Sequence, residues 1–569
     1  MITMNIKNIA LAFCVGCGCA AALTSCSDML ETESELVEYE KDNTLQSRTD
    51  SVYSVMGVIN KMQLIADRVV LLGEVRSDLV TVTEAATSDL KRLAAFDFTQ
   101  ANKYNQVSAY YAVINNCNYY LNHVDTTLQR RGRNLYQSEY AAMKVFRAWT
   151  YLELVKTYGE VPLVTTPMMT EREAAAAVAG PRSDIKTVCD FLIADLTPVA
   201  YVDIPHYGGL SRSEFFIPTR ALIGDLCLWA GRYAEAAKWY ADYLSDRNEP
   251  IRLNQANRSI WSSPTSFTRP NTNYRISDNE VLSYIPMETR VFDGVISDLP
   301  NIFKSTTDNY NYFQVQPSAA VKRLSAAQNY CMEFKTETAT DTIYVPKTGM
   351  SDGLLVGDLR LYSVFDQRTS GTQDPYSEYS STSQSISKIM NGQVNTYRSP
   401  MVYLRFAEAL NRAGYPQTAM LILKHGVCKE NANLYVDSVE YDASKQYLTF
   451  DETIFKREEV RGIHARGCGD VQCDTLYDVP LPATPLATRQ DTIAYQIPLV
   501  EDMIINEMAL EGFFEGYRFY DLMRVALRRD DPAYLADPVS RRNGEADPSL
   551  RALLMTKKNW FLPLPVTGN

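Results

Sequence analysis

The sequence lacks the catalytic motifs of the common enzyme classes. It contains no HExxH zinc motif, no GxSxG nucleophile motif and no Walker-type phosphate loop. Its four histidines are far apart in the sequence: His123, His206, His425 and His464. Paired carboxylates of the glycosidase type can be imagined anywhere among 68 acidic residues, so their presence decides nothing. These absences favour a protein that binds a ligand without turnover, and we expect no cofactor and no metal.

Basic residues are in deficit, and long apolar runs are missing from most of the chain. The 569 residues carry a formal charge of −12, which argues against a nucleic-acid partner because phosphates require a clustered basic surface. After residue 25, no apolar run reaches the length of a membrane-spanning helix. The body of the chain is therefore expected to lie outside the bilayer.

Cysteines are too few and too scattered for a disulfide framework. Seven remain after position 26, an odd number, at 117, 189, 227, 331, 428, 468 and 473. Only Cys468 and Cys473 are close enough for a local bridge, and the alternative is that they are buried thiols. With His464 they could supply three metal ligands, but this spacing fits no zinc signature.

The first residues have the pattern of a bacterial lipoprotein signal. A single base, Lys7, precedes a short apolar run, Ile9–Leu23, which is too short for a spanning helix. The tetrapeptide Leu23-Thr24-Ser25-Cys26 resembles the end of such a signal, and this resemblance implies that Cys26 becomes the lipidated first residue. The alternative is a plain signal peptide with a chance cysteine. Residues 1–25 are expected to be removed, which takes away one base and no acid, and residues 26–43 to form an acidic tether.

Helical periodicity dominates the two ends of the remaining chain. We predict helices over Thr44–Ala66, Tyr104–Val124 and Gln137–Tyr158. In the last of these, one apolar stripe contains Ala142, Val145, Phe146, Trp149 and Leu152. Gly159 can adopt the left-handed conformation that ends a helix.

Two helix–glycine–helix units resemble tetratricopeptide hairpins. A helix over Thr219–Ala230 is followed by Gly231 and a second helix, and Met401–Arg412 is followed by Ala413-Gly414 in the same way. No regular period of about 34 residues links the units, so an ordinary tandem array is excluded. One further strong helix is predicted over Glu501–Arg524.

Residues 245–399 differ from the helical ends of the chain in composition and in periodicity. Serine, threonine, asparagine and tyrosine dominate, and short strand-like runs occur at Glu280–Ile285 and Thr342–Val345. Tyrosine is in excess, at 36 residues, and its ring stacks on sugars while its hydroxyl adds a hydrogen bond. Our candidate ligand platforms in this polar region are Trp261, Phe267, Tyr274, Tyr310, Tyr312 and Phe313. The alternative for each is packing beneath its own loop.

Five blocks in order along the chain resemble the SusD/RagB family of outer-membrane nutrient-binding lipoproteins. They are the helix Tyr111–Leu121, Ala141–Tyr151 continued by Tyr158–Leu163, Tyr403–Ala409, Glu515–Arg524 and the tail Asn559–Pro565. Two further stretches, Gly357–Arg360 and Ile463–Asp470, look like local variants of the same family. Their role does not follow from the sequence.

The resemblance implies a mainly α-helical fold. It consists of tetratricopeptide-like helix pairs forming a scaffold, with irregular loops and a few short β-strands on the ligand face. Residues 44–569 would form a single body, divided into helical halves at 44–244 and 400–569 and a loop-rich ligand region at 245–399. Arg147, Glu408, Arg518 and Asp521 are then expected in buried ion pairs between helices, and Arg76 and Asp78 beside the ligand.

The resemblance also implies a function and a partner. It indicates a lipid-anchored outer-membrane protein facing the exterior, which binds oligosaccharide or possibly peptide and passes it to a SusC-like TonB-dependent transporter. Two other functions fit the sequence: a surface glycoside hydrolase, and a helical scaffold or adhesin that binds proteins.

Overall fold

The computed structural model describes most of the helical ends of the chain and part of its middle. The described residues are 48–206, 213–251, 280–288, 294–304, 313–328, 330–335, 340–345, 358–370, 381–386, 388–389, 392–467 and 478–564. None of the helices in these ranges combines the length and the apolar character needed to cross a bilayer.

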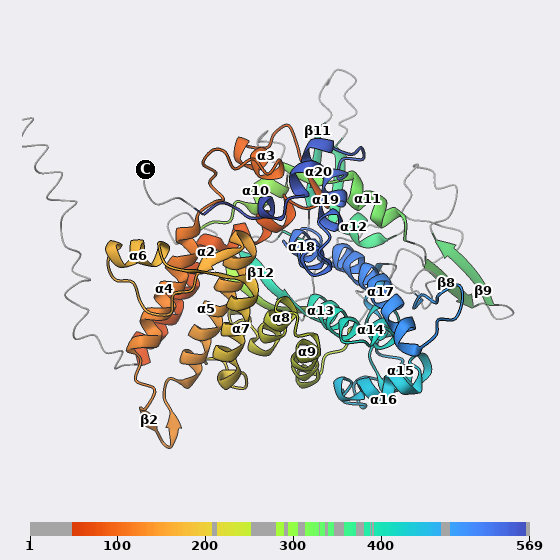
Figure 1. Cartoon of the computed structure of the whole chain (residues 1–569), viewed down its shortest axis with the longest axis horizontal. Coiled ribbons are helices and arrows are strands. Elements are labelled where there is room, and N and C mark those ends of the chain that lie inside the picture. The colour runs from red at the N-terminus through yellow and green to blue at the C-terminus, as the bar shows by residue number, and fades with distance from the viewer. Residues whose placement is uncertain are drawn as a thin grey trace, which may run out of the picture.

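The fold is mainly α-helical, and its long helices pack one on the next in a continuous series across the lower part of Figure 1. The series is α4 (Val107–His123), α5 (Gln137–Tyr158), α7 (Ile185–Leu196), α8 (Thr219–Trp229), α9 (Tyr233–Arg247), α13 (Ser399–Arg412) and α17 (Arg489–Gly512). At one end α2 (Arg48–Glu74) packs on α4 and α5, and α18 (Arg518–Arg529) contacts both α17 and α2. This contact brings the last third of the chain back onto α2, the first helix of the described residues.

Shorter helices surround this series. They are α3 (Ser88–Ala94), α6 (Glu171–Val178), α10 (Leu299–Phe303), α11 (Ala319–Ala326), α12 (Leu359–Val364), α14 (Pro416–Met420), α15 (Lys429–Tyr435), α16 (Ser438–Ser444), α19 (Ala533–Ser540) and α20 (Pro548–Leu554). A π-helical turn, η7 (Leu421–His425), continues α14, and short 3₁₀ turns include η4 (Ser213–Phe215) and η9 (Ile463–Gly467).

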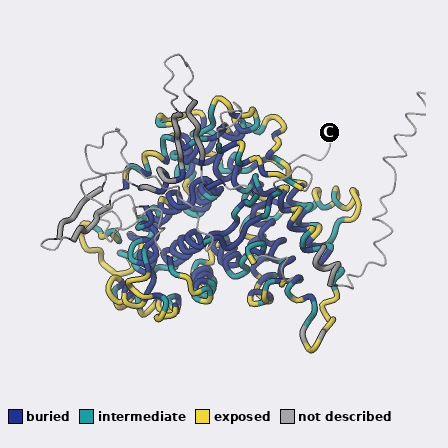
Figure 2. Tube along the Cα trace, turned by 180° about the vertical axis from the view of Figure 1, so that it is seen from behind, coloured by how far each residue is buried: buried dark blue, intermediate teal, exposed yellow. Residues whose placement is uncertain are grey.

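Strands in the described residues form antiparallel pairs. The pairs are β1 (Val80–Val82) with β7 (Val315–Pro317), β2 (Gln129–Arg130) with β3 (Arg133–Asn134), β4 (Glu160–Pro162) with β5 (Arg182–Asp184), β6 (Val281–Pro286) with β12 (Gln393–Arg398), β8 (Tyr330–Lys335) with β9 (Thr340–Val345), and β10 (Phe365–Ser370) with β11 (Ser381–Ile386). β6 and β9 confirm the two strand-like runs predicted from the sequence. Figure 2 shows buried segments through the centre of the helical body and exposed residues at its outer turns.

Helix α5 has the bounds that the sequence predicts. Its apolar stripe is buried, and neighbouring helices cover most of its other sides as well. Gly159 ends the helix with φ of +79°, and a Cβ there would lie 2.9 Å from the ring of Phe561. Glycine therefore serves two purposes here, a left-handed turn and room for the C-terminal tail.

The predicted hairpins are present, and small residues form their contacts. Gly231 joins α8 to α9 with φ of +77°, and Ala236 and Ala237 are fully buried. A Cβ on Gly224 would lie 2.6 Å from the ring of Tyr240, so glycine lets the two helices approach. Gly414, with φ of +97°, makes the corresponding turn between α13 and α14.

The prediction of one helix over Glu501–Arg524 is wrong, because the chain turns between Gly512 and Arg518. Helix α17 ends at Gly512 and α18 begins at Arg518. Gly516 has φ of +89°, and its backbone meets that of α2 so closely that a Cβ on Gly73 would lie 1.8 Å from the Gly516 carbonyl oxygen. The turn is thus set by a backbone contact with a helix more than 400 positions earlier, which no local pattern reveals.

The predicted buried ion pairs are confirmed. Arg147 pairs with Asp195 at 2.7 Å and joins α5 to α7. Arg518 holds Asp78 through Nε at 2.7 Å and Nη2 at 2.8 Å. Arg524 pairs with Glu408 of α13 and, at 2.9 Å, with Asp521.

A larger buried ion cluster explains the two family-like stretches whose role the sequence left open. Asp358 and Arg360 pair at 2.7 Å, and Arg360 reaches Glu511 of α17 at 3.0 Å. Arg466 of η9 also contacts Glu511, at 3.2 Å, and Glu280 at 2.9 Å. The two stretches therefore supply charges that tie the middle of the chain to α17.

Helix α17 and the turn after it complete this cluster. Arg398 contacts Glu511 at 2.9 Å and Glu515 at 2.7 Å, and Lys388 contacts Glu515 at 2.7 Å. Burial opposes ionisation of Glu511, but Arg466, Arg398 and Arg360 outweigh it and hold the pKa of Glu511 well below its ordinary value. The carboxylate stays charged because several cations share it.

Four cysteines in the described residues are buried thiols. They are Cys117, Cys189, Cys227 and Cys428. Burial raises the pKa of Cys117 to about 12 and that of Cys428 to about 11, which keeps both thiols protonated. Cys468 and Cys473 lie outside the described residues.

Candidate ligand-binding site

The loop after α2 and the segment after residue 312 meet in one small sheet. β1 pairs with β7 in antiparallel register, with Val80 opposite Pro317 and Val82 opposite Val315. Thr83 donates its hydroxyl to the carbonyl of Phe313 at 2.8 Å, across 230 positions of sequence. We call the surface built by residues 80–91, 296–304 and 313–317 the loop face.

Polar side chains surround the loop face. Asp67 of α2 accepts hydrogen bonds from the Ser297 hydroxyl at 2.6 Å and the Asp298 amide at 2.7 Å. Lys103 lies 3.6 Å from the Asp298 carboxylate, and both side chains are about half exposed. Glu84 is also exposed. The rim thus offers donors and acceptors of both charges to a polar ligand.

Most of the predicted platforms cannot be placed. Trp261, Phe267, Tyr274, Tyr310 and Tyr312 lie outside the described residues, as does the lipid-attachment residue Cys26. Phe313 is described and is only 7% exposed, with φ of +65°. In this conformation Phe313 packs beneath its own loop, the alternative that the sequence left open, and it offers no ring to a ligand.

Arg76 was predicted to contact the ligand, but the structure shows that it holds the scaffold together. Its guanidinium is fully buried and donates to the carbonyls of Leu72 at 2.7 Å and Trp560 at 2.8 Å. It also lies 4.1 Å over the ring of Phe519. Burial lowers the pKa of Arg76, and the Tyr520 hydroxyl opposes this effect. Arg76 therefore joins the end of α2 to the C-terminal tail.

Asp78 requires the same correction. Both of its carboxylate oxygens are occupied by Arg518, and its carbonyl accepts the Ser318 hydroxyl at 2.6 Å. The residue precedes β1 in the sequence, but its side chain is buried against the scaffold.

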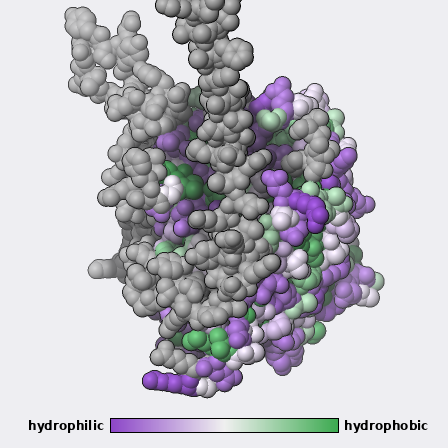
Figure 3. Space-filling model, turned by 90° about the vertical axis from the view of Figure 1, so that its left-hand side faces the viewer, coloured by the Kyte–Doolittle hydropathy of each residue, from purple (hydrophilic) through white to green (hydrophobic). Residues whose placement is uncertain are grey.

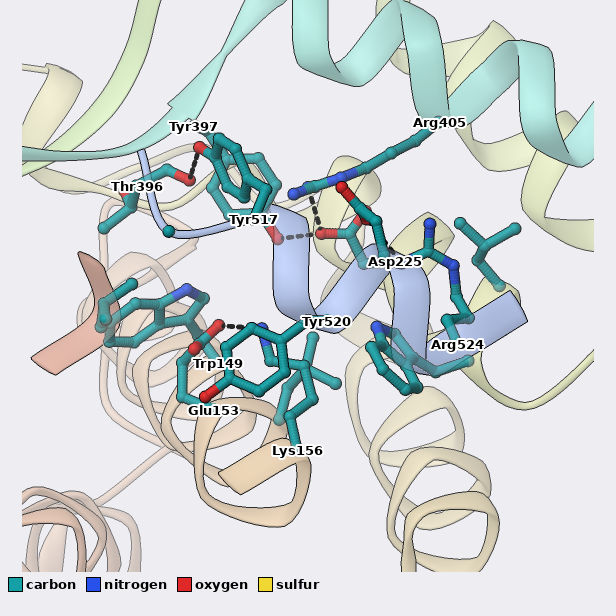
Figure 4. A pocket seen from close by; sticks show the side chains of 16 residues that line it. Trp149, Glu153, Lys156, Asp225, Thr396, Tyr397, Arg405, Tyr517, Tyr520 and Arg524 are labelled. Carbon is teal, nitrogen blue, oxygen red and sulfur yellow. Dashed lines mark hydrogen bonds and ion pairs between the residues drawn. The ribbon is translucent and has the colours of Figure 1, made fainter. Parts of the chain in front are cut away.

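A polar chamber lies at the centre of the molecule, between α5, α8, β12, α13 and α18 (Figure 4). The Asp225 carboxylate accepts from the Tyr240 hydroxyl at 2.5 Å, the Tyr397 hydroxyl at 2.6 Å and Arg405 at 2.7 Å. Burial first, and then Asp225, raise the pKa of both tyrosines well above the ordinary value. Asp225 is therefore a hub that joins α8, α9, β12 and α13.

The chamber has the residue types of a sugar site but not the room. It offers about 30 Å³, enough for about two water molecules. Its other carboxylates are also engaged: Glu153 pairs with Lys156 at 2.6 Å and Asp521 with Arg524. Lys156 in turn lies 4.7 Å over the ring of Tyr520. A sugar ring does not fit, so we assign the chamber to the scaffold.

A much larger cleft lies between the segment that follows α3 and the C-terminal tail. It has a volume of about 920 Å³ and is lined by Phe96 and Phe98, which follow α3, and by Phe561 and Leu564 of the C-terminal tail. Polar side chains, among them Thr99, Lys186 and Lys558, stand around these apolar walls. A concave site with aromatic walls and a few polar groups is the usual form of a small-ligand site. We call it the tail cleft.

The described residues contain no group of histidine, cysteine and acidic side chains arranged to hold a metal. His464, considered above as a metal ligand, instead contacts Glu507 through Nδ1 at 2.7 Å.

On the side shown in Figure 3, hydrophilic side chains cover most of the coloured surface, and hydrophobic ones gather in small groups.

A second large hollow, of about 1080 Å³, lies beside the N-terminal end of α8 and the C-terminal end of α9.

Residues 31–201 match a SusD-like family model described as "Starch-binding associating with outer membrane". No protein of curated function matches the sequence significantly.

Solved structures resemble this fold over nearly the whole chain. A SusD homolog from Bacteroides thetaiotaomicron is 17% identical, with a TM-score of 0.55 over 94% of this chain and 97% of that one. A SusD superfamily protein from Bacteroides vulgatus is 14% identical, with a TM-score of 0.52 over 84% and 88%. A SusD-like carbohydrate-binding protein from Bacteroides fragilis is 15% identical, with a TM-score of 0.51 over 85% and 87%.

Proposed function

Because this chain is a member of the SusD family, we propose that it is a cell-surface lipoprotein that binds oligosaccharides and delivers them to a SusC-like TonB-dependent transporter. Carbohydrate binding and association with the outer membrane are properties of the family as its model describes it. We propose that both properties hold for this chain. Cys26 would carry the lipid, residues 26–43 would form the tether, and the folded body would face the exterior of the cell.

The observation that carries the proposal is the pairing of β1 with β7. It joins the segment after α2 to Val315–Pro317 in the middle of the chain, which supports a ligand face built from these two parts of the chain. The tail cleft, which begins at the segment after α3, is lined by Phe98 and Phe561. Aromatic walls beside polar rims suit oligosaccharides, whose two faces are apolar and whose edges bear hydroxyls.

We further propose that binding occurs without turnover. A glycosidase requires two carboxylates facing the scissile bond across an open space. In the central chamber Glu153, Asp225 and Asp521 are each paired, and the space between them admits only water. No cofactor is required for this function.

A glycan-and-peptide array probed with the mature protein, without its lipid, tests the binding claim. We expect oligosaccharide binding, and no release of reducing ends during prolonged incubation with the ligand. Phe98→Ala and Tyr312→Ala should each weaken binding by about tenfold. Leu434→Ala, at an exposed position on α15, is the matched control. Sustained release of reducing ends would instead establish a hydrolase, and binding only to folded proteins would favour a scaffold or adhesin.

Purification from detergent-solubilised outer membranes tests the partner. We expect a large β-barrel protein as the dominant companion of the wild-type chain, and loss of membrane attachment in Cys26→Ala. A Cys26→Ala chain that remained in the membrane fraction without any partner would contradict the lipid anchor.

A further inference from the structure

The hollow beside α8 and α9 has walls from five separate segments. They are residues 200–204, residues 213–220 around the start of α8, residues 242–249 at the end of α9, residues 281–282 of β6 and residues 449–451. Its volume of about 1080 Å³ is large enough for several sugar units. We call it the α8–α9 groove. It shares no lining residue with the tail cleft.

Tyr201 presents an aromatic surface to the groove. It is 69% exposed, an unusual state for a tyrosine. Its ring is nonetheless held in place, because it lies 6.1 Å from the ring of Trp239 and the Arg220 guanidinium lies 5.3 Å from its centroid. An exposed ring that is already ordered loses little entropy when a ligand stacks on it.

Arg220 is itself fixed by two carboxylates. It contacts Asp242 at 2.9 Å through one terminal nitrogen and Asp246 through the other. Partial burial opposes its charge, but the two carboxylates outweigh this and raise the pKa of Arg220. Asp242 is 38% exposed and Asp246 68% exposed, so oxygens of both can still accept hydrogen bonds from a ligand. Charged acceptors beside an aromatic ring match the hydroxyls and the apolar face of one sugar unit.

The charge of the groove restricts which sugars fit. Of the described residues that line it, six are acidic and two are basic, Arg220 and Arg247. The acids are Asp203, Glu214, Asp242, Asp246, Glu249 and Asp451. Both bases are already paired, Arg247 with Glu249 at 2.6 Å. Among the described lining residues, a carboxylated or sulfated glycan would therefore meet repulsion without a free cation to offset it.

We propose that the α8–α9 groove is a second carbohydrate-binding site, distinct from the loop face and the tail cleft, which takes neutral or amino sugars and rejects acidic ones. Tyr201 is the stacking platform, and Asp242 and Asp246 are the hydroxyl acceptors. This inference rests on the proposed function as a glycan-binding protein.

Saturation-transfer NMR and calorimetry on the mature protein test the proposal. The probes are hexasaccharides of glucose, xylose and mannose (neutral), of glucosamine (cationic) and of galacturonic acid (anionic). We expect at least one neutral or cationic hexamer to bind, and part of this binding to occur in the groove. Tyr201→Ala should weaken that groove component of the binding by about tenfold. Tyr201→Phe, which keeps the ring, should retain that component. Because Tyr201 is largely exposed, neither change should alter the melting temperature, and Tyr495→Ala, at another exposed tyrosine, is the control.

The outcomes separate this inference from the proposed function. If sugar binding is lost in Phe98→Ala and unchanged in Tyr201→Ala, the groove is not a sugar site, although the proposed function stands. Preference of the Tyr201-dependent component for the galacturonic acid hexamer would overturn the charge argument, and binding of hexalysine alone in the groove would mark it as a site for basic peptides. If none of the hexamers binds the wild-type protein, both the groove and the glycan-binding function fail.

Discussion

Single residues determine how closely the backbone segments of this fold can approach. Gly516 is the clearest case, because its φ is +89° and a Cβ there would lie 2.3 Å from the carbonyl oxygen of Val69. Either feature alone disfavours any other residue, and here both apply to the same position.

Gly516→Ala should lower the free energy of unfolding by about 2–4 kcal/mol, because the side chain requires both a strained φ and displacement of α2. Urea unfolding followed by circular dichroism measures the change. Gly57→Ala is the matched control, since Gly57 lies within α2 and a Cβ there would contact nothing within 4 Å. That control should be neutral or stabilise the protein by up to about 1 kcal/mol. Equal effects at both positions would contradict the argument.

Glu74 makes stability depend on pH. Burial raises its pKa to about 8, and its backbone partner Gly516, at 2.9 Å, only partly opposes this. Between the ordinary value of 4.5 and about 8, the folded protein keeps a proton that the unfolded chain releases. The contribution of Glu74 to stability is therefore complete below pH 4.5 and is lost as the pH rises to 8.

Glu74→Gln should remove this dependence, because the amide stays neutral and still accepts from Gly516. The difference in unfolding free energy between Glu74→Gln and wild type should grow by up to about 1.4 kcal/mol per pH unit from pH 5 to 8. Urea titrations at several pH values measure it, with the exposed Glu84→Gln as control. Parallel curves for wild type and Glu74→Gln would show that Glu74 is charged in the folded state.

At the scale of the elements, buried ion pairs decide how helices and loops are joined. Arg518 links the start of α18 to the segment after α2 through Asp78, and the cluster around Glu511 links β12, α12 and η9 to α17. Such pairs add little net stability compared with an apolar contact, but loss of one partner leaves a buried charge.

Asp78→Ala should therefore destabilise the protein by about 3–5 kcal/mol, because it leaves Arg518 buried without its carboxylate. The double variant Asp78→Ala/Arg518→Met should recover part of that loss. Thermal unfolding of both variants provides the comparison. Asp298→Ala, which removes a half-exposed partner of Lys103, should change stability by less than about 1 kcal/mol. If Asp78→Ala weakened glycan binding at unchanged stability, Asp78 would be a ligand contact after all.

At the scale of the molecule, one hydrophobic core extends from Val55 in α2 to Leu562 in the tail. The tail closes this core. Trp560 is fully buried, its indole donates to the carbonyl of Leu554 at 2.7 Å, and its own carbonyl accepts from Arg76.

Trp560→Ala should lower stability by about 3–5 kcal/mol through the cavity it leaves. Because the core is shared, calorimetry should show one unfolding transition in both wild type and variant, at a lower temperature in the variant. The control is Pro563→Ala, at an exposed tail position. A variant that melts in two separate steps would show that the two ends of the chain fold independently.

The features that residue patterns predicted are those with local causes, whereas the buried ion pairs of Arg147, Glu408, Arg518 and Asp521 were expected from the family resemblance. The bounds of α5, the hairpin turns at Gly231 and Gly414, and the strands β6 and β9 follow from periodicity and from glycine within a short window. Only the tertiary structure decided the break between α17 and α18, the scaffold roles of Arg76 and Asp78, the cluster around Glu511 and the position of the α8–α9 groove. In each of these cases the contacting groups lie far apart along the chain. Gly516 and Glu74 are 442 positions apart, Arg76 and Trp560 are 484 apart, and Arg398 and Glu511 are 113 apart. Local sequence specifies which backbone conformation is favourable, whereas the partner of a buried charge and the walls of a cavity exist only after distant segments have packed together.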